Sequence, residues 1–275
     1  MQTREERSVV AQNGDEPEMG VLVSRPSDQG PYPVLLVIHE AFGIDTWVED
    51  ITKRFAAEGF VAVAPDLFSV DPFGKTVKPG EVKEIFALRF KLPPERRGDA
   101  NAVEEELNKL PAEKAERMRN VMRWSGERDT GALVRHVERA VEWSRQRDDT
   151  TQKVGIVGFC FGGGMVLRAV FEGLDLDAAA PFYGANPPLD KVGNVKCPLL
   201  LMYGRDDPYI MPQVPDLLKV IQEAELRFGL HIYEEAGHAF LNDQRPEMYS
   251  VSASKVAWPA TIAFFKSHLG EARKS

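Results

Sequence analysis

Cysteine is scarce in this sequence, which contains only Cys160 and Cys197 among its 275 residues. Two cysteines build neither a disulfide framework nor a metal-binding spacing. We therefore expect a reduced, cytoplasmic protein that uses no metal ion and no cofactor.

Long apolar runs and an excess of positive charge are missing as well. No stretch of about 18 or more apolar residues occurs, so no membrane span is predicted, and the polar N-terminus has no apolar signal segment. The net charge of −8 argues against a nucleic-acid-binding surface. An anionic substrate would need locally placed cations, and the composition does not indicate an oligomeric state.

What the sequence does contain is a strand, sharp turn and helix pattern around Cys160. A short apolar run begins at Val154, glycines stand two positions before and after the cysteine, and an amphipathic stretch begins at Met165. Such glycines leave room for a turn that holds its central residue in a strained conformation. A nucleophile in this turn lies at a helix N-terminus, where its pKa is lowered and backbone N–H groups face an oxyanion. The alternative is a buried cysteine beside a glycine-rich turn.

The rest of the chain alternates between strand and helix patterns. The apolar run 34–38 is typical of a strand covered on both faces, a helix pattern follows Asp45, and a second strand covers 60–64. This βαβ unit implies a parallel sheet. Further strands are predicted at 19–24, 178–183, 198–203 and 230–234, and further helices at 130–147, 215–224 and 254–269. We predict an α/β fold: a doubly wound, mostly parallel sheet with helices on both faces.

Residues 67–127 interrupt this alternation with five prolines and long charged stretches. A connection from strand to helix needs only a few residues, so this segment is an insertion. Helices are predicted within it at 81–91, 100–110 and 112–124. Because it has few aliphatic residues for a core of its own, we expect a helical, cap-like excursion that shapes the site, within a single domain spanning 1–275.

A nucleophile needs a base, and five histidines are available. His238 follows the last predicted strand, at the sheet edge where ligands and catalytic loops gather in doubly wound folds. His136 and His268 fall in predicted helices with charged neighbours and are expected at the surface. His231 lies within a strand pattern, whereas His39 lies at a strand end and is not excluded by its position. We predict that His238 is the base.

The base in turn needs an orienting acid. The loop 203–210 follows the preceding strand and contains Asp206 and Asp207. Adjacent carboxylates cannot both point at one imidazole, and at least one fits a turn-forming role, so the residues alone leave the choice open. The order of nucleophile, acid and histidine along the chain is that of α/β-hydrolases.

With these residues in place, the chain resembles the dienelactone hydrolase family, the cysteine branch of the α/β-hydrolase fold. The likeness extends from about Val21 to Leu269 apart from the insertion. It is carried by the segments 39–43 (HEAFG), 66–68 (DLF), 158–163 (GFCFGG), 204–210 (GRDDPYI) and 237–240 (GHAF). The resemblance implies that Asp207 is the catalytic acid and that Glu40 contacts the thiol of Cys160. It also implies an oxyanion hole formed by the N–H groups of Ala41 and Phe161.

The family's substrate is a lactone bearing a carboxylate that arginines hold. One of these usually follows the catalytic histidine by four positions, where this chain has Asn242; Arg245 is close but out of register. The second arginine belongs to the expanded region, where the candidates are Arg89, Arg96 and Arg97. We prefer Arg89.

An apolar part of the substrate would need an apolar pocket. Phe42 and Trp47 are candidates to line it, and core packing is the other role open to them.

We therefore predict a hydrolase of activated esters or lactones that acts through a thioester on Cys160. Its partner is a small-molecule ester or lactone. One alternative is a cysteine peptidase or amidotransferase-like enzyme, although the acid loop between Cys160 and His238 fits the hydrolase better. Another is a non-catalytic protein that binds a small molecule, against which the intact set of catalytic residues argues.

Overall fold

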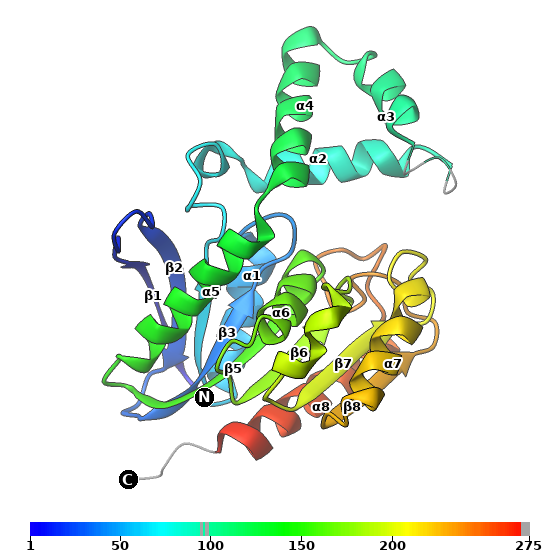
Figure 1. Cartoon of the computed structure of the whole chain (residues 1–275). Coiled ribbons are helices and arrows are strands. Elements are labelled where there is room, and N and C mark those ends of the chain that lie inside the picture. Colours follow the sequence, from blue (N-terminus) through cyan, green and yellow to red (C-terminus); the bar gives the residue numbers. More distant parts are fainter. Residues whose placement is uncertain (94–95, 97–98, 271–275) are drawn as a thin grey trace.

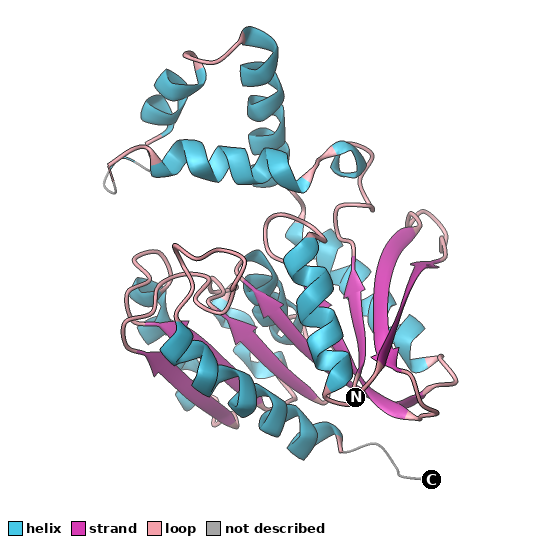
Figure 2. Ribbon diagram, turned by 180° about the vertical axis from the view of Figure 1, so that it is seen from behind, coloured by secondary structure: helices cyan, strands magenta, loops and turns pink. Residues whose placement is uncertain are grey.

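The structure, a computed structural model, describes residues 1–93, 96 and 99–270 and is built around one large sheet (Figures 1 and 2). Within this described part the sheet has eight strands in the order β1-β2-β4-β3-β5-β6-β7-β8. They are β1 (Thr3–Val10), β2 (Met19–Pro26), β3 (Tyr32–Ile38), β4 (Val61–Pro65), β5 (Thr150–Phe159), β6 (Ala178–Phe182), β7 (Leu199–Gly204) and β8 (Phe228–Tyr233). β2 pairs antiparallel with β1 and β4, and the other neighbours pair in parallel. The predicted mostly parallel sheet is confirmed.

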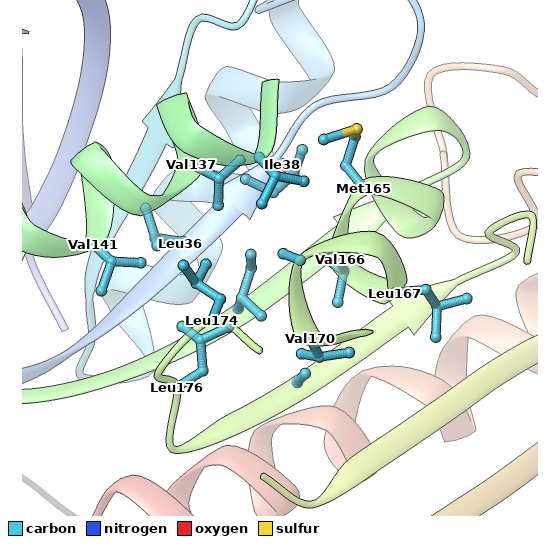
Figure 3. Close-up of a cluster of buried hydrophobic side chains, with 14 of the residues drawn as sticks. Leu36, Ile38, Val137, Val141, Met165, Val166, Leu167, Val170, Leu174 and Leu176 are labelled. Carbon is cyan, nitrogen blue, oxygen red and sulfur yellow. The ribbon is translucent and has the colours of Figure 1, made fainter. Parts of the chain in front are cut away.

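Helices cover both faces of this sheet. α5 (Thr130–Arg145), α6 (Phe161–Phe171) and α7 (Val214–Glu223) pack on one face, and α1 (Thr46–Ala57) and α8 (Val251–Leu269) pack on the other. β3 is buried along its whole length, which accounts for its uninterrupted apolar sequence. On the first face Leu36 of β3, Val137 of α5 and Val166 of α6 converge (Figure 3). Each fully buried aliphatic side chain of this kind stabilises the fold by about 1.5–3 kcal/mol.

The first strand was not predicted from the sequence. β1 pairs with β2 along its whole length, from Thr3 opposite Pro26 to Val10 opposite Met19. Its sequence, TREERSVV, is mostly polar because β1 is an edge strand with most of its side chains in solvent. Charged side chains on an edge strand also discourage pairing with another chain.

The inserted segment folds into three helices beyond the C-terminal ends of the strands (Figure 1). They are α2 (Pro79–Phe90), α3 (Ala100–Leu107) and α4 (Ala112–Glu127). The expectation that this segment lacks a core of its own was wrong. Its helices enclose an apolar cluster that includes Ile85, Val103 and Val121, and Phe42 and Phe68 join this cluster from the loops after β3 and β4.

The turn between β5 and α6 depends on very close backbone packing. Cys160 lies at the turn with φ 55° and ψ −113°, directly before the first residue of α6. A Cβ atom on Gly158 would lie 2.3 Å from the carbonyl oxygen of Gly162, and one on Gly162 would lie 2.2 Å from that of Ile38. Both glycines are therefore required by the approach of α6 to β5 and β3.

We expect Gly162→Ala to destabilise the protein by about 3 kcal/mol or more, because its Cβ would overlap a backbone atom that cannot rotate away. Gly164→Ala is the matched control on the same helix, since its Cβ would meet no atom closer than 3.5 Å. Thermal unfolding followed by circular dichroism compares the two variants. Equal melting temperatures would contradict this account of the turn.

Candidate active site

Four polar side chains meet at the C-terminal edge of the sheet. Cys160 follows β5, Asp207 follows β7, His238 follows β8 and Glu40 follows β3. Parallel strands place their C-terminal ends on the same edge, which is why residues so far apart in the sequence can converge. Cys160 and His238 are partly exposed, whereas Asp207 and Glu40 are buried.

His238 and Asp207 form a short hydrogen bond. Nδ1–H of His238 donates to Oδ2 of Asp207 at 2.6 Å. The other carboxylate oxygen of Asp207 accepts from the backbone N–H groups of Tyr209 at 3.0 Å and Ile210 at 3.1 Å. Asp207 is only 1% exposed, and these bonds fix its carboxylate toward the imidazole. Asp206 is exposed to solvent.

The charge environment of His238 favours its protonated form. Burial alone would lower its pKa, but the pKa is raised well above the ordinary value because of the nearby Cys160 and the hydrogen bond to Asp207. An imidazolium at this position would have the carboxylate of Asp207 as one hydrogen-bond partner and the side chain of Cys160 as another neighbour.

Glu40 is a buried carboxylate with one free oxygen. It is 2% exposed, and its Oε2 accepts a hydrogen bond of 2.9 Å from Nδ2 of Asn242. No hydrogen bond to Oε1 occurs within the described part of the chain. Burial raises the pKa of Glu40, while Arg245, Asn242 and His238 act to lower it. Asn242, which stands where the family has an arginine, was not predicted to bind Glu40.

His39 was also a candidate for the base because of its position at a strand end. In the structure it contacts other groups. It is fully buried, its Nδ1 bonds to the backbone oxygen of Glu40 at 2.6 Å, and its ring stacks on that of Phe161. Another histidine prediction was wrong: His136 is 5% exposed rather than at the surface. Nδ1 of His136 lies 3.2 Å from Arg139 Nη1 and 3.3 Å from Glu16 Oε2, which provide polar partners for this nitrogen in its buried position.

The two N–H groups expected to form an oxyanion hole flank the site. Phe161 N–H opens α6 directly after Cys160, and Ala41 N–H follows Glu40. Among the described residues, neither group donates a hydrogen bond to another backbone or side-chain atom. Both are therefore able to donate to a negatively charged oxygen.

A cavity of about 290 Å³ opens beside Cys160 and His238. Its other lining residues are Thr130, Phe161, Gly164, Met165, Arg168, Tyr183, Ala185, Asn186, Pro187 and Ile210. None of them comes from α2, α3 or α4, so these three helices do not line this cavity. Tyr183 was not singled out from the sequence, although its place at the end of a strand beside the nucleophile strand was a usable signal.

The structure does not bring the expected substrate-binding residues to this cavity. Arg89 lies in α2 and Trp47 packs on Phe159 in the core, with ring centroids 4.9 Å apart. Phe42 instead lines a separate cavity of about 270 Å³ together with Arg245 and residues of α2. Arg96 is exposed and pairs with acidic neighbours, and Arg97 lies outside the described residues.

Two further observations concern metals and membranes. The described residues contain no cluster of three or more His, Cys, Asp or Glu side chains that could hold a metal ion. In the same part of the chain, no helix combines the length and apolar character needed to cross a bilayer.

The fold agrees with comparisons to known proteins. The model of the dienelactone hydrolase family matches residues 19–269. A carboxymethylenebutenolidase from Pseudomonas putida is 27% identical over 231 residues, which cover 83% of each chain. A relative from Saccharolobus solfataricus, named provisionally for the same activity, is 30% identical over 239 residues, or 86% of this chain and 90% of the relative.

Solved structures show the same architecture. A dienelactone hydrolase from Anabaena variabilis superposes with a TM-score of 0.63 at 18% identity, covering 98% of this chain and 100% of the other. A Klebsiella pneumoniae protein, provisionally titled a dienelactone hydrolase, gives 0.71 at 22% identity, covering 96% and 99%. The fold is that of an α/β-hydrolase. The chain belongs to the dienelactone hydrolase family and is a hydrolase of ester or lactone bonds.

Replacing Glu40 by glutamine should raise the melting temperature by a few degrees at neutral pH while lowering activity. The folded-state pKa of Glu40 is raised above its ordinary 4.5, so its contribution to stability is complete below that value and is lost as the pH rises through the folded pKa. The difference in melting temperature between Glu40→Gln and the unmodified protein should therefore increase from acidic to neutral pH. Thermal unfolding across this range measures it.

Glu234→Gln, at a carboxylate that is 71% exposed, serves as the control for a general charge effect. If Glu40→Gln were less stable than the unmodified protein at every pH, the carboxylate would be a stabilising group and the analysis of its burial would be wrong.

Proposed function

We propose that this enzyme hydrolyses activated esters or lactones through a thioester on Cys160, with His238 as the base and Asp207 as its orienting acid. The observation that carries the proposal is the 2.6 Å hydrogen bond between His238 and the buried Asp207, beside the sharp turn at Cys160. Each of the three residues follows a different parallel strand, so the sheet itself holds the group together.

Acylation begins with a proton transfer from the thiol of Cys160. Oε1 of Glu40 accepts that proton, since Oε2 already accepts from Asn242. The thiolate then attacks the carbonyl carbon, and the oxygen that becomes negative receives hydrogen bonds from the N–H groups of Ala41 and Phe161. When the tetrahedral intermediate collapses, the C–O bond breaks and the imidazolium of His238 gives its proton to the leaving oxygen.

Deacylation uses the same imidazole in its neutral form. Formation of the thioester removes the negative charge from sulfur, and with it the largest attraction that raises the His238 pKa. The neutral imidazole can then take a proton from water, which attacks the thioester carbonyl. The second tetrahedral intermediate expels the thiolate, His238 is again protonated, and the proton held by Glu40 returns to the sulfur of Cys160.

The use of a thiolate as nucleophile limits which substrates the enzyme can hydrolyse. A thiolate is expelled from a tetrahedral intermediate more readily than an alkoxide, so attack by Cys160 succeeds best when the substrate's own leaving group is a good one. Enol esters and lactones meet this condition better than amides do. The carboxymethylenebutenolidase names of the two relatives support a lactone of this kind.

Cys160→Ala should abolish hydrolysis of p-nitrophenyl acetate and leave the fold intact, because the turn accommodates a small side chain. Cys160→Ser should be slower than the unmodified enzyme, since a hydroxyl is far harder to deprotonate than a thiol. Steady-state rates together with thermal unfolding test both. Turnover retained by the alanine variant would reject a covalent mechanism on Cys160.

Asp207→Asn should lower kcat by roughly 10³-fold or more, because the imidazolium loses the carboxylate that orients and stabilises it. Asp206→Asn is the neighbouring control, and its exposed side chain predicts only a small effect. The same ester assay compares the two variants. A larger loss in Asp206→Asn would show that the acid has been placed on the wrong residue.

A further inference from the structure

Tyr183 lies at the centre of the site without a role in the mechanism above. It directly follows β6, has no exposed surface, and its ring centroid is 5.2 Å from that of His238. Its φ of 39° is in the left-handed region, which is strained for a side chain of this size. Strained positions of this kind cluster at functional sites.

The hydroxyl of Tyr183 has no hydrogen-bond partner within the described part of the chain. Burying an unpaired hydroxyl is costly, so its presence needs an explanation. Tyr203 provides a comparison, because it is also fully buried and its hydroxyl is also unpaired. Burial is the cause of the raised pKa of Tyr203. The pKa of Tyr183 is also raised by burial, and further by the negative charges of Glu40, Cys160 and Asp207.

A neutral tyrosine hydroxyl that is close to negatively charged groups acts as a hydrogen-bond donor. Most of the carboxylate oxygens of Asp207 and Glu40 already accept hydrogen bonds from other groups. Both oxygens of Asp207 already accept hydrogen bonds from His238 and from backbone N–H groups. Oε2 of Glu40 accepts from Asn242. Oε1 of Glu40 has no hydrogen bond within the described part of the chain, and the mechanism proposed above uses it to take up the thiol proton. Cys160 lines the same cavity as Tyr183, so its sulfur is a further acceptor.

We propose that the hydroxyl of Tyr183 donates a hydrogen bond to the sulfur of Cys160 when that sulfur is a thiolate, which makes Tyr183 a further catalytic residue. The inference rests on the proposed function of Cys160. The S–H bond breaks and its proton forms an O–H bond on Glu40, while Tyr183 keeps its own proton throughout. The negative charge has then moved from the carboxylate to the sulfur, where a buried donor is available.

The other charged groups near the sulfur have partners of their own. His238 approaches as the imidazolium partner, and Arg245 acts on Glu40 and Tyr183 from the loop after β8. Arg168 lines the cavity from α6, but its Nε donates to Glu172 at 3.0 Å. A second donor on the thiolate lowers the pH at which the sulfur becomes reactive.

The test measures the pH dependence of Cys160 alkylation by iodoacetamide in the full-length protein, which requires no knowledge of the substrate. Mass spectrometry of the modified peptide separates Cys160 from Cys197, whose burial raises its pKa to about 11. Tyr183→Phe should move the midpoint upward by about one pH unit and slow alkylation at neutral pH about tenfold, as expected for a lost hydrogen bond to a charged group. Tyr203→Phe is the matched control and should leave the midpoint unchanged.

Equal midpoints for the two phenylalanine variants, whether shifted or not, would overturn the proposal. A double-mutant cycle with Glu40→Gln adds a second criterion. The effect of Tyr183→Phe should persist in the glutamine background; its disappearance would mean that the hydroxyl acts on Glu40 and not on the sulfur. Loss of ester hydrolysis in Cys160→Ala, measured separately, shows whether the proposed function itself stands.

Discussion

The turn at Cys160 is the constraint on which the site depends. α6 reaches the ends of β5 and β3 only because Gly158 and Gly162 let backbone atoms approach to distances that a Cβ would forbid. This approach places the N-terminus of α6, with its partial positive charge, at the sheet edge. It also puts the Phe161 N–H directly after Cys160, so one close contact positions both the proposed nucleophile and one proposed donor for an oxyanion.

Around this turn, buried charges are balanced by neutral partners as well as by cations. Asp207 is held by two backbone N–H groups and His238, whereas Glu40 is held by the amide of Asn242. An amide offers a hydrogen bond without a full positive charge, and burial of Glu40 raises its pKa despite the attraction of Arg245. A carboxylate in this condition readily takes up a proton, which is what the activation of a neighbouring thiol requires.

The sequence allowed the main strands and helices to be predicted because buried parallel strands are uninterrupted apolar runs, as in β3. β1 was not predicted, because most of its side chains are in solvent and its sequence is therefore polar and lacks an apolar run. The contact between Asn242 and Glu40 joins residues 202 positions apart, and no local pattern encodes such a pair. The position of Arg89 depends on how α2 is oriented over the sheet, which is decided by packing across several elements and not by the sequence of α2.

Contacts from the inserted helices, and from Arg128 directly after them, reach Phe42 and Phe161, which adjoin or carry the two N–H groups that we propose as oxyanion donors. Phe42, next to Ala41, packs against Phe86 of α2 with ring centroids 5.5 Å apart. Arg128, which follows α4, lies 4.5 Å from the ring centroid of Phe161 and also stacks on Trp124 of α4. If these N–H groups stabilise an oxyanion as proposed, the position of the inserted helices affects the transition state through them.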